Sequence, residues 1–462
     1  MNRSVIILYL FVSLLLISNC ERPSPFPEHA LILNDVHVLT MDSEEILANQ
    51  TVVIVDGSIE WVGASRDAIL PGEATVIEGP YYVMPGLAEM HGHIPGDRQG
   101  RQYAEDILAL YVAQGVTFVR SMAGNPLHLE LREAAENAEI LSPGIMSASP
   151  SFSGGSAPDV ETARSRVNEH YEAGHDLLKV ATGMSLEVFS AMADEANTLG
   201  IEFSGHIPFS VGLQRALEAP YGTIDHLDRY MEFLAGDPED REDPPTIWFG
   251  FDLTGQVDEA RIREAARKTV RAGVGNVATN TLLENVFNPD LSPETMSRWP
   301  GMDLLPPRTV ENWIQRVHDL RADPLYDPEK ARRYLEIRKQ LTRALYEEGP
   351  DLLLLGADAP QIFNPPGFSV HRELEIKVDA GLTPYEALRT GTVNVGYYIG
   401  EEERTGKVLP GYHADLLLLS VNPLETLPFG HAIEGVILQG EYLSRQVLDQ
   451  RLEETRRRTR DM

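Results

Sequence analysis

The chain has 462 residues, of which 43% are hydrophobic and 24% are charged. This composition supports a large core and excludes a globally disordered chain. The 70 acidic residues outnumber the 39 basic ones and give a formal net charge of −31, which disfavours binding to the phosphate backbone of nucleic acids. A single cysteine also excludes disulfide frameworks and cysteine-cluster metal sites.

Residues 1–20 have the pattern of a signal peptide. Arg3 supplies a positive charge, and residues 5–17 are almost wholly apolar but too short to span a bilayer comfortably. The segment ends in Leu16-Ile17-Ser18-Asn19-Cys20, which is similar to a bacterial lipobox, although Asn19 replaces the usual small residue. We therefore expect an exported protein of the periplasm or cell envelope, lipid-anchored through Cys20. Ordinary secretion with an incidental cysteine is the alternative.

Short β-like segments occupy both ends of the remaining chain. Between residues 30 and 82, apolar stretches are interrupted by turn sequences at Asn34-Asp35, Asp56-Gly57 and Pro71-Gly72. Comparable apolar stretches recur at 414–419 and 432–438. We therefore predict a small discontinuous β-sandwich domain, built from residues 30–82 and 400–445.

The middle of the chain alternates apolar strands with amphipathic helices, which is typical of a parallel sheet with crossover helices. The predicted strands are Tyr82–His91, Val116–Met122, Gly144–Ser149, Asp176–Ala181, Glu202–His206, Thr223–His226, Val274–Thr279 and Leu352–Asp358. Eight strands are what a (β/α)8 barrel requires, so the predicted fold is α/β, with a TIM barrel over residues 83–399. We interpret the stretch at about 280–350 as a lid-like insertion over the barrel mouth, with an ordinary surface insertion as the alternative.

Side chains of the metal-ligand type stand at the ends of the predicted strands. His91 and His93 are two residues apart in the first strand, so their side chains point to the same face. Further candidates stand at or near the ends of the fourth, fifth, sixth and eighth strands: Lys179, His206, His226 and Asp358. Active sites of barrels lie at the carboxyl ends of the strands, so we expect these residues to converge. Imidazoles and a carboxylate suit zinc or a similar divalent ion.

Lys179 is unusual in such a set, because a charged ammonium would repel metal ions. If its amine captures carbon dioxide, it becomes an anionic carbamate whose two oxygens can bridge two metals about 3.5–4 Å apart. A lysine that reaches into solvent is the alternative.

These residues, in this order, make the chain similar to the amidohydrolase superfamily, especially its imidazolonepropionase-like and Xaa-Pro dipeptidase-like branch. The resemblance covers nearly everything after residue 20, including Met84-Pro85-Gly86, the His-x-His pair and the Lys, His, His, Asp series. It extends over residues 372–384 and 406–416.

The resemblance implies a binuclear metal centre that hydrolyses an amide-type C–N bond. It implies that His91, His93 and Asp358 hold the more buried ion, that His206 and His226 hold the more exposed one, and that carboxylated Lys179 bridges both. The implied cofactors are two divalent ions, with zinc expected, and carbon dioxide as the lysine carbamate. Metal-bound hydroxide would attack the carbonyl, while Asp358, the catalytic residue, would take the proton and deliver it to the departing amine.

One segment departs from the family pattern. Related enzymes often carry Gly-Gly-His after the third strand, with the histidine on the substrate carbonyl, whereas this chain has Gly154-Gly155-Ser156. Substrate identity therefore does not carry over from the family. Candidate substrate contacts are Tyr230, Arg229 and Arg372, any of which could meet a carboxylate, with a structural role as the alternative for each.

The sequence thus predicts a metal-dependent hydrolase that acts on dipeptides or N-acyl amino acids. One alternative is a mononuclear metal deaminase or cyclic-amide hydrolase, in which Lys179 does not touch the metal. A remote alternative is a non-catalytic ligand-binding lipoprotein. The expected partner is a small-molecule amide substrate, without nucleic acid and with membrane contact only through the N-terminal anchor. A homo-oligomer is left open.

Overall fold

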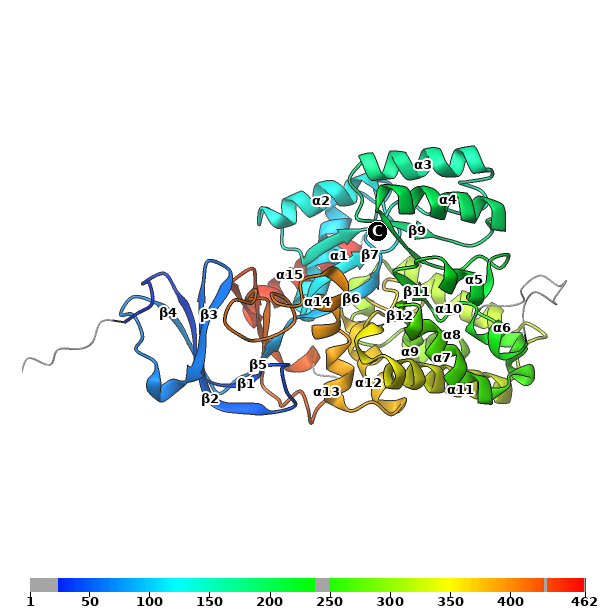
Figure 1. Cartoon of the computed structure of the whole chain (residues 1–462). Helices are drawn as coiled ribbons and strands as arrows, with labels where there is room; N and C mark the ends of the chain where they lie inside the picture. The colour runs from blue at the N-terminus through cyan, green and yellow to red at the C-terminus, as the bar shows by residue number, and fades with distance from the viewer. Residues whose placement is uncertain (1–23, 237–248, 428–429, 461) are drawn as a thin grey trace, which may run out of the picture.

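The computed structural model describes residues 24–236, 249–427, 430–460 and 462. The expected signal peptide and Cys20 lie outside these residues. A β-rich part stands at one end of the molecule and a larger part, built of parallel strands and helices, at the other (Figure 1). Within the described ranges, no helix combines the length and the apolar character needed to cross a bilayer.

Both ends of the described chain contribute strands to one eight-stranded sheet. Its main path is β16-β15-β14-β5-β1-β2-β3, and β4 pairs with β1 beside this path. The strands are β1 (Leu31–Leu39), β2 (Ile46–Val55), β3 (Ser58–Ala64), β4 (Thr75–Glu78), β5 (Tyr82–Pro85), β14 (Leu416–Leu419), β15 (Ile433–Leu438) and β16 (Glu441–Ser444). The two chain ends meet where β5 pairs antiparallel with β14, whose four leucines are fully buried. The division of the chain into domains remains a prediction.

Two of the predicted turns in this sheet have different outcomes. Asp56 and Gly57 join β2 to β3 with φ values of 47° and 78°, as a two-residue hairpin turn of the primed type requires. The turn expected at Asn34-Asp35 is wrong, because β1 continues through it with a register shift between Leu33 and Val36. Asp35 takes up the irregularity at a φ of 55°. Such a bulge uses the same residue types as a turn but does not reverse the chain.

The larger part contains eight parallel strands in two sheets, β6-β7-β8 and β13-β12-β11-β10-β9. These strands are β6 (Leu87–Gly92), β7 (Val116–Ser121), β8 (Gly144–Ser147), β9 (Leu177–Val180), β10 (Glu202–Gly205), β11 (Thr223–Asp225), β12 (Gly275–Val277) and β13 (Leu353–Leu354). Single parallel bridges, Ala148 to Leu177 and Gly92 to Ala359, connect the two sheets. The predicted α/β fold is therefore confirmed, whereas a closed ring of strand ladders, as in a TIM barrel, is not.

The predicted strand Tyr82–His91 is in fact two strands in two different sheets. β5 belongs to the eight-stranded sheet, and β6 to the first parallel sheet. The chain changes sheets at Gly86, where a Cβ atom would lie only 2.2 Å from Thr117 Oγ1. A close approach of this kind requires glycine, and an apolar run alone does not reveal it.

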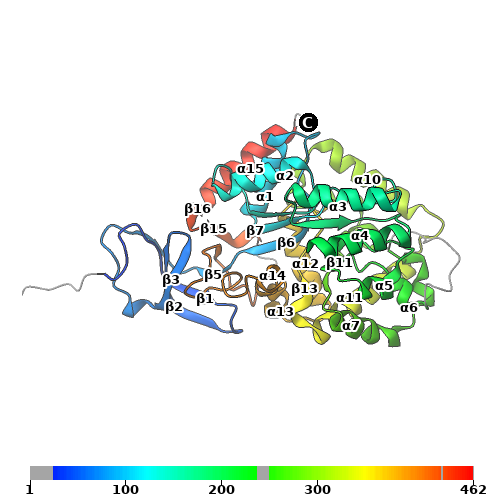
Figure 2. The same ribbon diagram turned by 45° about the horizontal axis from the view of Figure 1, so that its top comes forward.

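Helices follow most of the parallel strands and cover them. They are α1 (Arg101–Ala113), α2 (Pro126–Glu136), α3 (Val160–Glu172), α4 (Leu186–Leu199), α5 (Gly212–Glu218), α6 (Tyr230–Leu234), α7 (Ile262–Arg271), α8 (Asn280–Phe287), α9 (Pro293–Met296), α10 (Pro307–Arg321), α11 (Pro328–Glu348), α12 (Phe368–Asp379), α13 (Pro384–Arg389), α14 (Val393–Ile399) and α15 (Arg445–Arg460). Figure 2 shows α3 and α4 side by side over the strands. Asp159 and Ser185 cap these two helices by accepting hydrogen bonds from first-turn amides, which stabilises each by about 1 kcal/mol.

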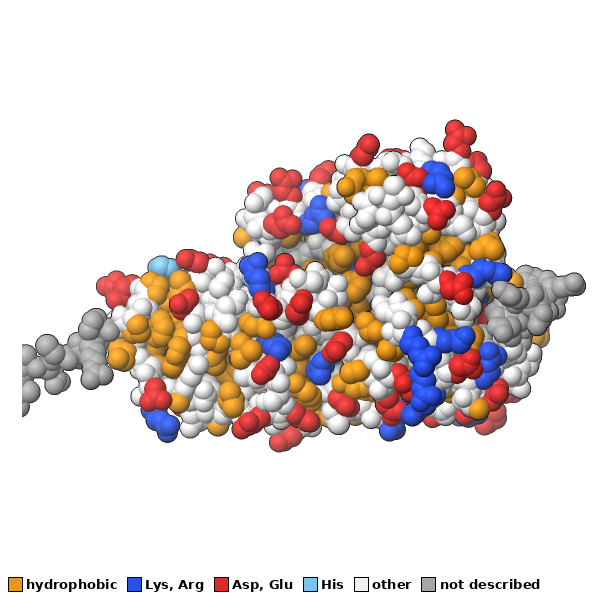
Figure 3. All heavy atoms as spheres, viewed as in Figure 1, with side chains coloured by type: hydrophobic (Ala, Val, Ile, Leu, Met, Phe, Trp, Pro, Cys, Tyr) orange, Lys and Arg blue, Asp and Glu red, His pale blue; other side chains and the backbone are white. Residues whose placement is uncertain are grey.

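The stretch at about 280–350 is helical and contains α8 to α11. Its helix α10 brings Trp313 and Arg316 to the wall of a cavity of about 970 Å³. The lid function itself remains a prediction. In Figure 3, basic side chains gather over α7 and α11, interspersed with carboxylates. Arg263 and Arg267 there lie 2.8 Å and 3.1 Å from Glu347 and Glu348. These are exposed pairs, which contribute little to stability.

Candidate metal centre

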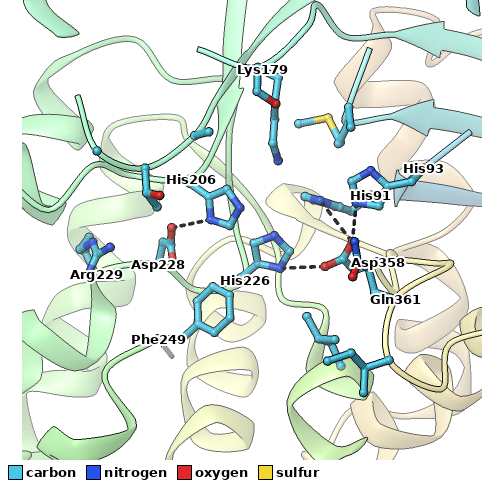
Figure 4. Close-up of a pocket in the computed structure, with 18 of the residues that line it drawn as sticks. His91, His93, Lys179, His206, His226, Asp228, Arg229, Phe249, Asp358 and Gln361 are labelled. Atoms are coloured by element: carbon cyan, nitrogen blue, oxygen red, sulfur yellow. Dashed lines mark hydrogen bonds and ion pairs between the residues drawn. The ribbon is translucent and has the colours of Figure 1, made fainter. Parts of the chain in front are cut away.

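The six predicted ligand residues surround one cavity of about 970 Å³ at the carboxyl ends of the parallel strands. His91 lies in β6 and His93 directly after it, Lys179 lies in β9, His206 and His226 directly follow β10 and β11, and Asp358 follows β13. Figure 4 shows their side chains directed toward a common space, with Lys179 entering from the side opposite Phe249. Residues far apart in the sequence thus come together as predicted, because each parallel strand ends at the same rim.

Asp358 is the carboxylate around which the histidines gather. Its Oδ1 atom lies 2.6 Å from His93 Nε2 and 3.7 Å from His91 Nε2, and its Oδ2 atom lies 3.8 Å from His226 Nδ1. The ring centroids of His91 and His226 are 4.4 Å apart, and those of His206 and His226 are 4.7 Å apart. Imidazoles crowded so closely around a carboxylate form a donor set that a divalent cation would hold together.

Three of the histidines direct Nδ1 toward a neighbour in the wall of the site. Asp228 Oδ2 is 2.9 Å from His206 Nδ1, and Thr279 Oγ1 is 2.8 Å from His226 Nδ1. Asp225 Oδ2 lies 2.7 Å from His91 Nδ1, although without the alignment of a hydrogen bond. Metal-ligating histidines characteristically use one nitrogen in this way and leave the other for the ion. The arrangement fits a site for divalent cations.

Burial sets the charge state of the central imidazoles. It lowers the pKa of His91 well below its usual value, with the charges of Lys179 and His93 adding to the effect. Burial likewise lowers the pKa of His226, reinforced by His91 and His206. Both rings are therefore neutral at physiological pH, which is the form that ligates metals.

Asp228 behaves in the opposite way. Burial disfavours its charged form, but the charge and hydrogen bond of His206 outweigh this penalty and hold the pKa of Asp228 below its usual value. The carboxylate also accepts a hydrogen bond from the backbone amide of Ile207 at 3.1 Å. It is therefore a fixed anion that orients His206.

Lys179 is a buried amine with little to bind it. The residue is 4% exposed, and its Nζ atom has no hydrogen-bond partner in the described part of the chain. Asp225 Oδ2 lies 3.8 Å from that nitrogen. Burial lowers the pKa of Lys179, opposed by the charges of Asp225 and Asp358. No hydrogen bond from the described residues therefore offsets the cost of burying this amine.

Arg120 lies behind the ligands and is fully buried. It donates to Asp225 Oδ1 at 3.2 Å, to Thr223 Oγ1 at 3.0 Å and to the Met90 carbonyl at 2.7 Å. Its remaining terminal nitrogen donates to the Tyr398 hydroxyl at 2.8 Å. A guanidinium held by this many acceptors fixes the carboxylate of Asp225 in place behind His91 and Lys179.

The backbone of the site is strained. His226 and Asp358 adopt left-handed φ values of 60° and 62°, and Thr279, which contacts His226, has a φ of 46°. Such values are uncommon outside glycine and are outliers for a β-branched residue. Each costs on the order of 1–3 kcal/mol and characteristically occurs at functional sites.

The three candidate substrate-contact residues, unlike the six candidate ligands, do not all line the central cavity. Arg229 lines the cavity, but it donates to Glu232 Oε1 at 2.5 Å and to the Ile207 carbonyl at 3.0 Å. Tyr230 is fully buried behind the cavity wall, with its hydroxyl 2.8 Å from Thr269 Oγ1. Arg372 lines a different cavity. Ser156, which stands where the family has histidine, uses its hydroxyl within its own turn, donating to the Ser151 carbonyl at 2.8 Å.

Sequence reasoning missed the residues that support the ligands, of which Arg120, Asp225, Asp228 and Thr279 are the main ones. A signal was present for two of them, because Asp225 and Asp228 flank His226 in the chain. Nothing local marks Arg120 or Thr279, whose partners come from other strands.

No protein-family model matches the chain. Among curated proteins, an adenine deaminase of Paracoccus denitrificans (strain Pd 1222) is 20% identical over 419 residues, which cover 89% of this chain and 57% of that protein. The chain therefore spans little more than half the length of the curated relatives it matches.

Two solved structures illustrate the structural likeness. Bottromycin amidohydrolase aligns with a TM-score of 0.68 and 22% identity, over 94% of this chain and 92% of that one. A prolidase complexed with N-methylphosphonate-L-proline aligns with a TM-score of 0.67 and 20% identity, over 90% and 100%. These structural neighbours belong to the amidohydrolase superfamily, and the proteins that the chain matches are hydrolases acting on C–N bonds, as the sequence predicted. At these identities the likeness itself establishes a shared fold.

Proposed function

We propose that this chain is a metal-dependent amidohydrolase that cleaves an amide-type C–N bond in a dipeptide or an N-acyl amino acid. The observation that carries the proposal is the convergence of four imidazoles, the carboxylate of Asp358 and the amine of Lys179 on one cavity. The cavity volume, about 970 Å³, is at the upper end of what small-molecule sites usually measure.

The proposal includes the barrel architecture. The bridges between Ala148 and Leu177 and between Gly92 and Ala359 support a (β/α)8 barrel whose two sheets are its halves. This architecture accounts for a site at the carboxyl ends of strands from both sheets.

His91, His93 and Asp358 would hold one ion, and His206 and His226 a second, with Lys179 between them. Their ligand atoms support this assignment, since those of His91, His93 and Asp358 lie within 4.8 Å of one another. When bound, divalent ions at this site would lower the pKa of a water molecule and polarise the scissile carbonyl.

Asp358 is the proposed proton carrier. It is 6% exposed and faces His93 at 2.6 Å, so its carboxylate is fixed within the cavity. It would accept a proton from the attacking water as the C–O bond forms and return that proton to the amine nitrogen as the C–N bond breaks. The products are a carboxylic acid and an amine, which together contain the atoms of the amide and one water and which ionise to a carboxylate and an ammonium ion.

Lys179 is the proposed site of carboxylation. Its amine would form a C–N bond with the carbon of carbon dioxide and release one proton, which yields an anionic carbamate. The burial of Nζ, its lowered pKa and its missing hydrogen-bond partner among the described residues support this step. Carboxylation would also remove an ammonium group that is costly to bury without a hydrogen-bond partner.

A mononuclear deaminase is the second candidate, favoured by the name of the curated relatives. In this case Lys179 would not contact metal. Zinc-loaded protein is therefore to be analysed for metal content beside Lys179→Ala, with Lys268→Ala, an exposed lysine on α7, as the control. Two zinc ions per chain that fall in Lys179→Ala alone support the bridged centre, whereas one ion, unchanged by either substitution, supports the deaminase.

The reaction itself is tested by a substrate screen of the zinc-loaded protein. The panel contains dipeptides with and without proline, N-acyl amino acids, cyclic amides, lactones and adenine. Release of a free amine from dipeptides or N-acyl amino acids, abolished in Asp358→Asn, is the expected result. Turnover of adenine or of cyclic amides alone would contradict the proposed substrate class. No turnover of any member would contradict the proposed hydrolase.

A further inference from the structure

A second cavity of about 370 Å³ lies outside the proposed catalytic site and shares no lining residue with the central one. Aromatic and proline side chains form much of its lining, namely Trp299, Pro300, Phe363, Pro365 and Phe368. The polar part of the lining consists of Arg372 together with Gln114, Ser369, His371 and His431. This volume lies within the range of small-ligand sites. The cavity therefore has the size and the walls to accept a planar apolar group.

Arg372 is the charged group of this cavity. Its guanidinium stacks on Trp299, with 3.6 Å between the guanidinium carbon and the ring centroid, and one terminal nitrogen donates to Asn285 Oδ1 at 2.8 Å. In the described part of the chain, no carboxylate oxygen lies within 4.0 Å of its nitrogens. Burial lowers the pKa of Arg372 to about 10.

Three carboxylates act electrostatically on Arg372, those of Glu284, Glu373 and Glu375. Two of them are committed to other partners. Glu284 Oε1 lies 3.5 Å from Lys339 Nζ. Glu373 is fully buried, accepts a hydrogen bond from the Thr281 hydroxyl at 2.6 Å and lies 3.7 Å from Lys377. Arg372 is thus a half-buried guanidinium, stacked on an aromatic ring and without a direct ion pair among the described residues. An anion that paired with it would supply the missing charge-assisted hydrogen bonds.

We propose that this second cavity binds a small aromatic carboxylate, whose carboxylate pairs with Arg372 and whose ring packs against the aromatic walls. The guanidinium already lies on Trp299, so its plane is fixed and its remaining hydrogens are arranged for a planar, bidentate acceptor. The aromatic lining selects for a ring over an aliphatic chain.

The cavity is connected to the loop that carries Asp358. Beyond Arg372, Asn285 Nδ2 donates to Asn364 Oδ1 at 2.8 Å, and Asn364 Nδ2 donates to the carbonyl of Ala357 at 2.5 Å. Both asparagines are fully buried, and Ala357 directly precedes Asp358. A ligand that fixes Arg372 therefore also stabilises the hydrogen bonds that hold this loop. The catalytic meaning of this link rests on the proposed function, but the link itself does not.

Binding is tested by calorimetric titration of the metal-free full chain with phenylacetate, phenylacetamide and acetate. We expect phenylacetate to bind about tenfold to a hundredfold more tightly than the uncharged amide, and acetate to bind more weakly than phenylacetate. Arg372→Gln should lose this advantage, whereas Arg316→Gln, in the central cavity, should keep it. Equal affinity for acid and amide, or loss in Arg316→Gln alone, would overturn the proposal. The comparison of the two ligands needs no variant and stands even if Arg372→Gln does not fold.

The link to Asp358 is tested by hydrogen exchange of the segment 357–364. Saturating phenylacetate should slow amide exchange there in the wild-type chain. In Asn364→Ala, phenylacetate should still bind but should no longer slow exchange. Binding without any change of exchange in the wild-type chain would refute the link. Neither measurement uses turnover, so failure here leaves the proposed amidohydrolase untouched, and absence of turnover leaves this site untouched.

Discussion

Replacing Asp225 with asparagine tests whether the buried polar cluster behind the metal ligands is a coupled unit. Asp225 and Arg120 are both fully buried, 3.2 Å apart, and asparagine preserves the side-chain volume, so packing contributes little. Removing one partner of a buried ion pair costs about 3–5 kcal/mol. Arg120 keeps its hydrogen bonds to Met90, Thr223 and Tyr398, which places the expected loss at the lower end, about 3 kcal/mol.

The assay is urea unfolding of chelator-treated protein, followed by far-UV circular dichroism, so that metal binding does not contribute. Asp176→Asn is the matched control, because its partner Arg132 lies 2.7 Å away in a partly exposed pair and we expect a loss of at most about 1 kcal/mol. The double variant Arg120→Met with Asp225→Asn should cost less than the sum of its single substitutions by more than about 0.5 kcal/mol. A loss below about 1 kcal/mol in Asp225→Asn, or strict additivity in the double variant, would refute the coupled cluster.

Three further outcomes follow from particular contacts. Gly205→Ala should bind fewer metal ions per chain, because Gly205 has a φ of +120° and a Cβ there would lie 2.9 Å from Lys179 Cδ; wild-type metal content by elemental analysis would contradict this. Burial lowers the pKa of His371 to about 4. As the pH falls below about 6.5, this histidine therefore binds a proton in the unfolded chain before it does so in the folded one. The free energy of unfolding then drops by up to about 1.4 kcal/mol per pH unit, down to about pH 4. His371→Gln should remove that part of the slope in urea unfolding between pH 6.5 and pH 4.5, and an unchanged slope would be inconsistent with a buried neutral ring. Arg458→Gln should lower the free energy of unfolding by about 1–3 kcal/mol, because Arg458 is the ion-pair partner of the buried Asp106; equal stability by the same measurement would exclude a role for this pair in holding α15.

Much of the fold could be predicted from the sequence because its strands are marked by local apolar runs. Each of the eight predicted strands of the α/β part has a counterpart in the structure. Errors occurred where a local pattern has two physical outcomes. Asn34-Asp35 suits both a turn and a bulge, and the run Tyr82–His91 is divided at Gly86 by the neighbouring Thr117. A contact such as that between Gly86 and Thr117 depends on how two segments pack together. The residue pattern within one segment does not reveal it.

The convergence of the candidate ligand residues could be predicted for a related reason, whereas the residues that support them could not. His206 and His226 stand directly after strands β10 and β11, so position in the chain alone places them at the rim. Arg120 is separated from Asp225 by 105 positions, and an arginine inside a strand usually reaches into solvent.

Electrostatics nevertheless explains why a carboxylate lies behind the candidate ligands. Lys179 and Arg120 bring two cationic groups to the same buried region, and Asp225 lies within 4.0 Å of a nitrogen of each. One carboxylate thus faces both cations and also the Nδ1 atom of His91 at 2.7 Å. Carboxylation of Lys179 would turn one of these cations into an anion, and Arg120 would then be the cation that balances Asp225. If Lys179 is carboxylated as proposed, the fixed guanidinium of Arg120 would keep a cation beside Asp225, and a ligand pattern along the chain does not reveal this support.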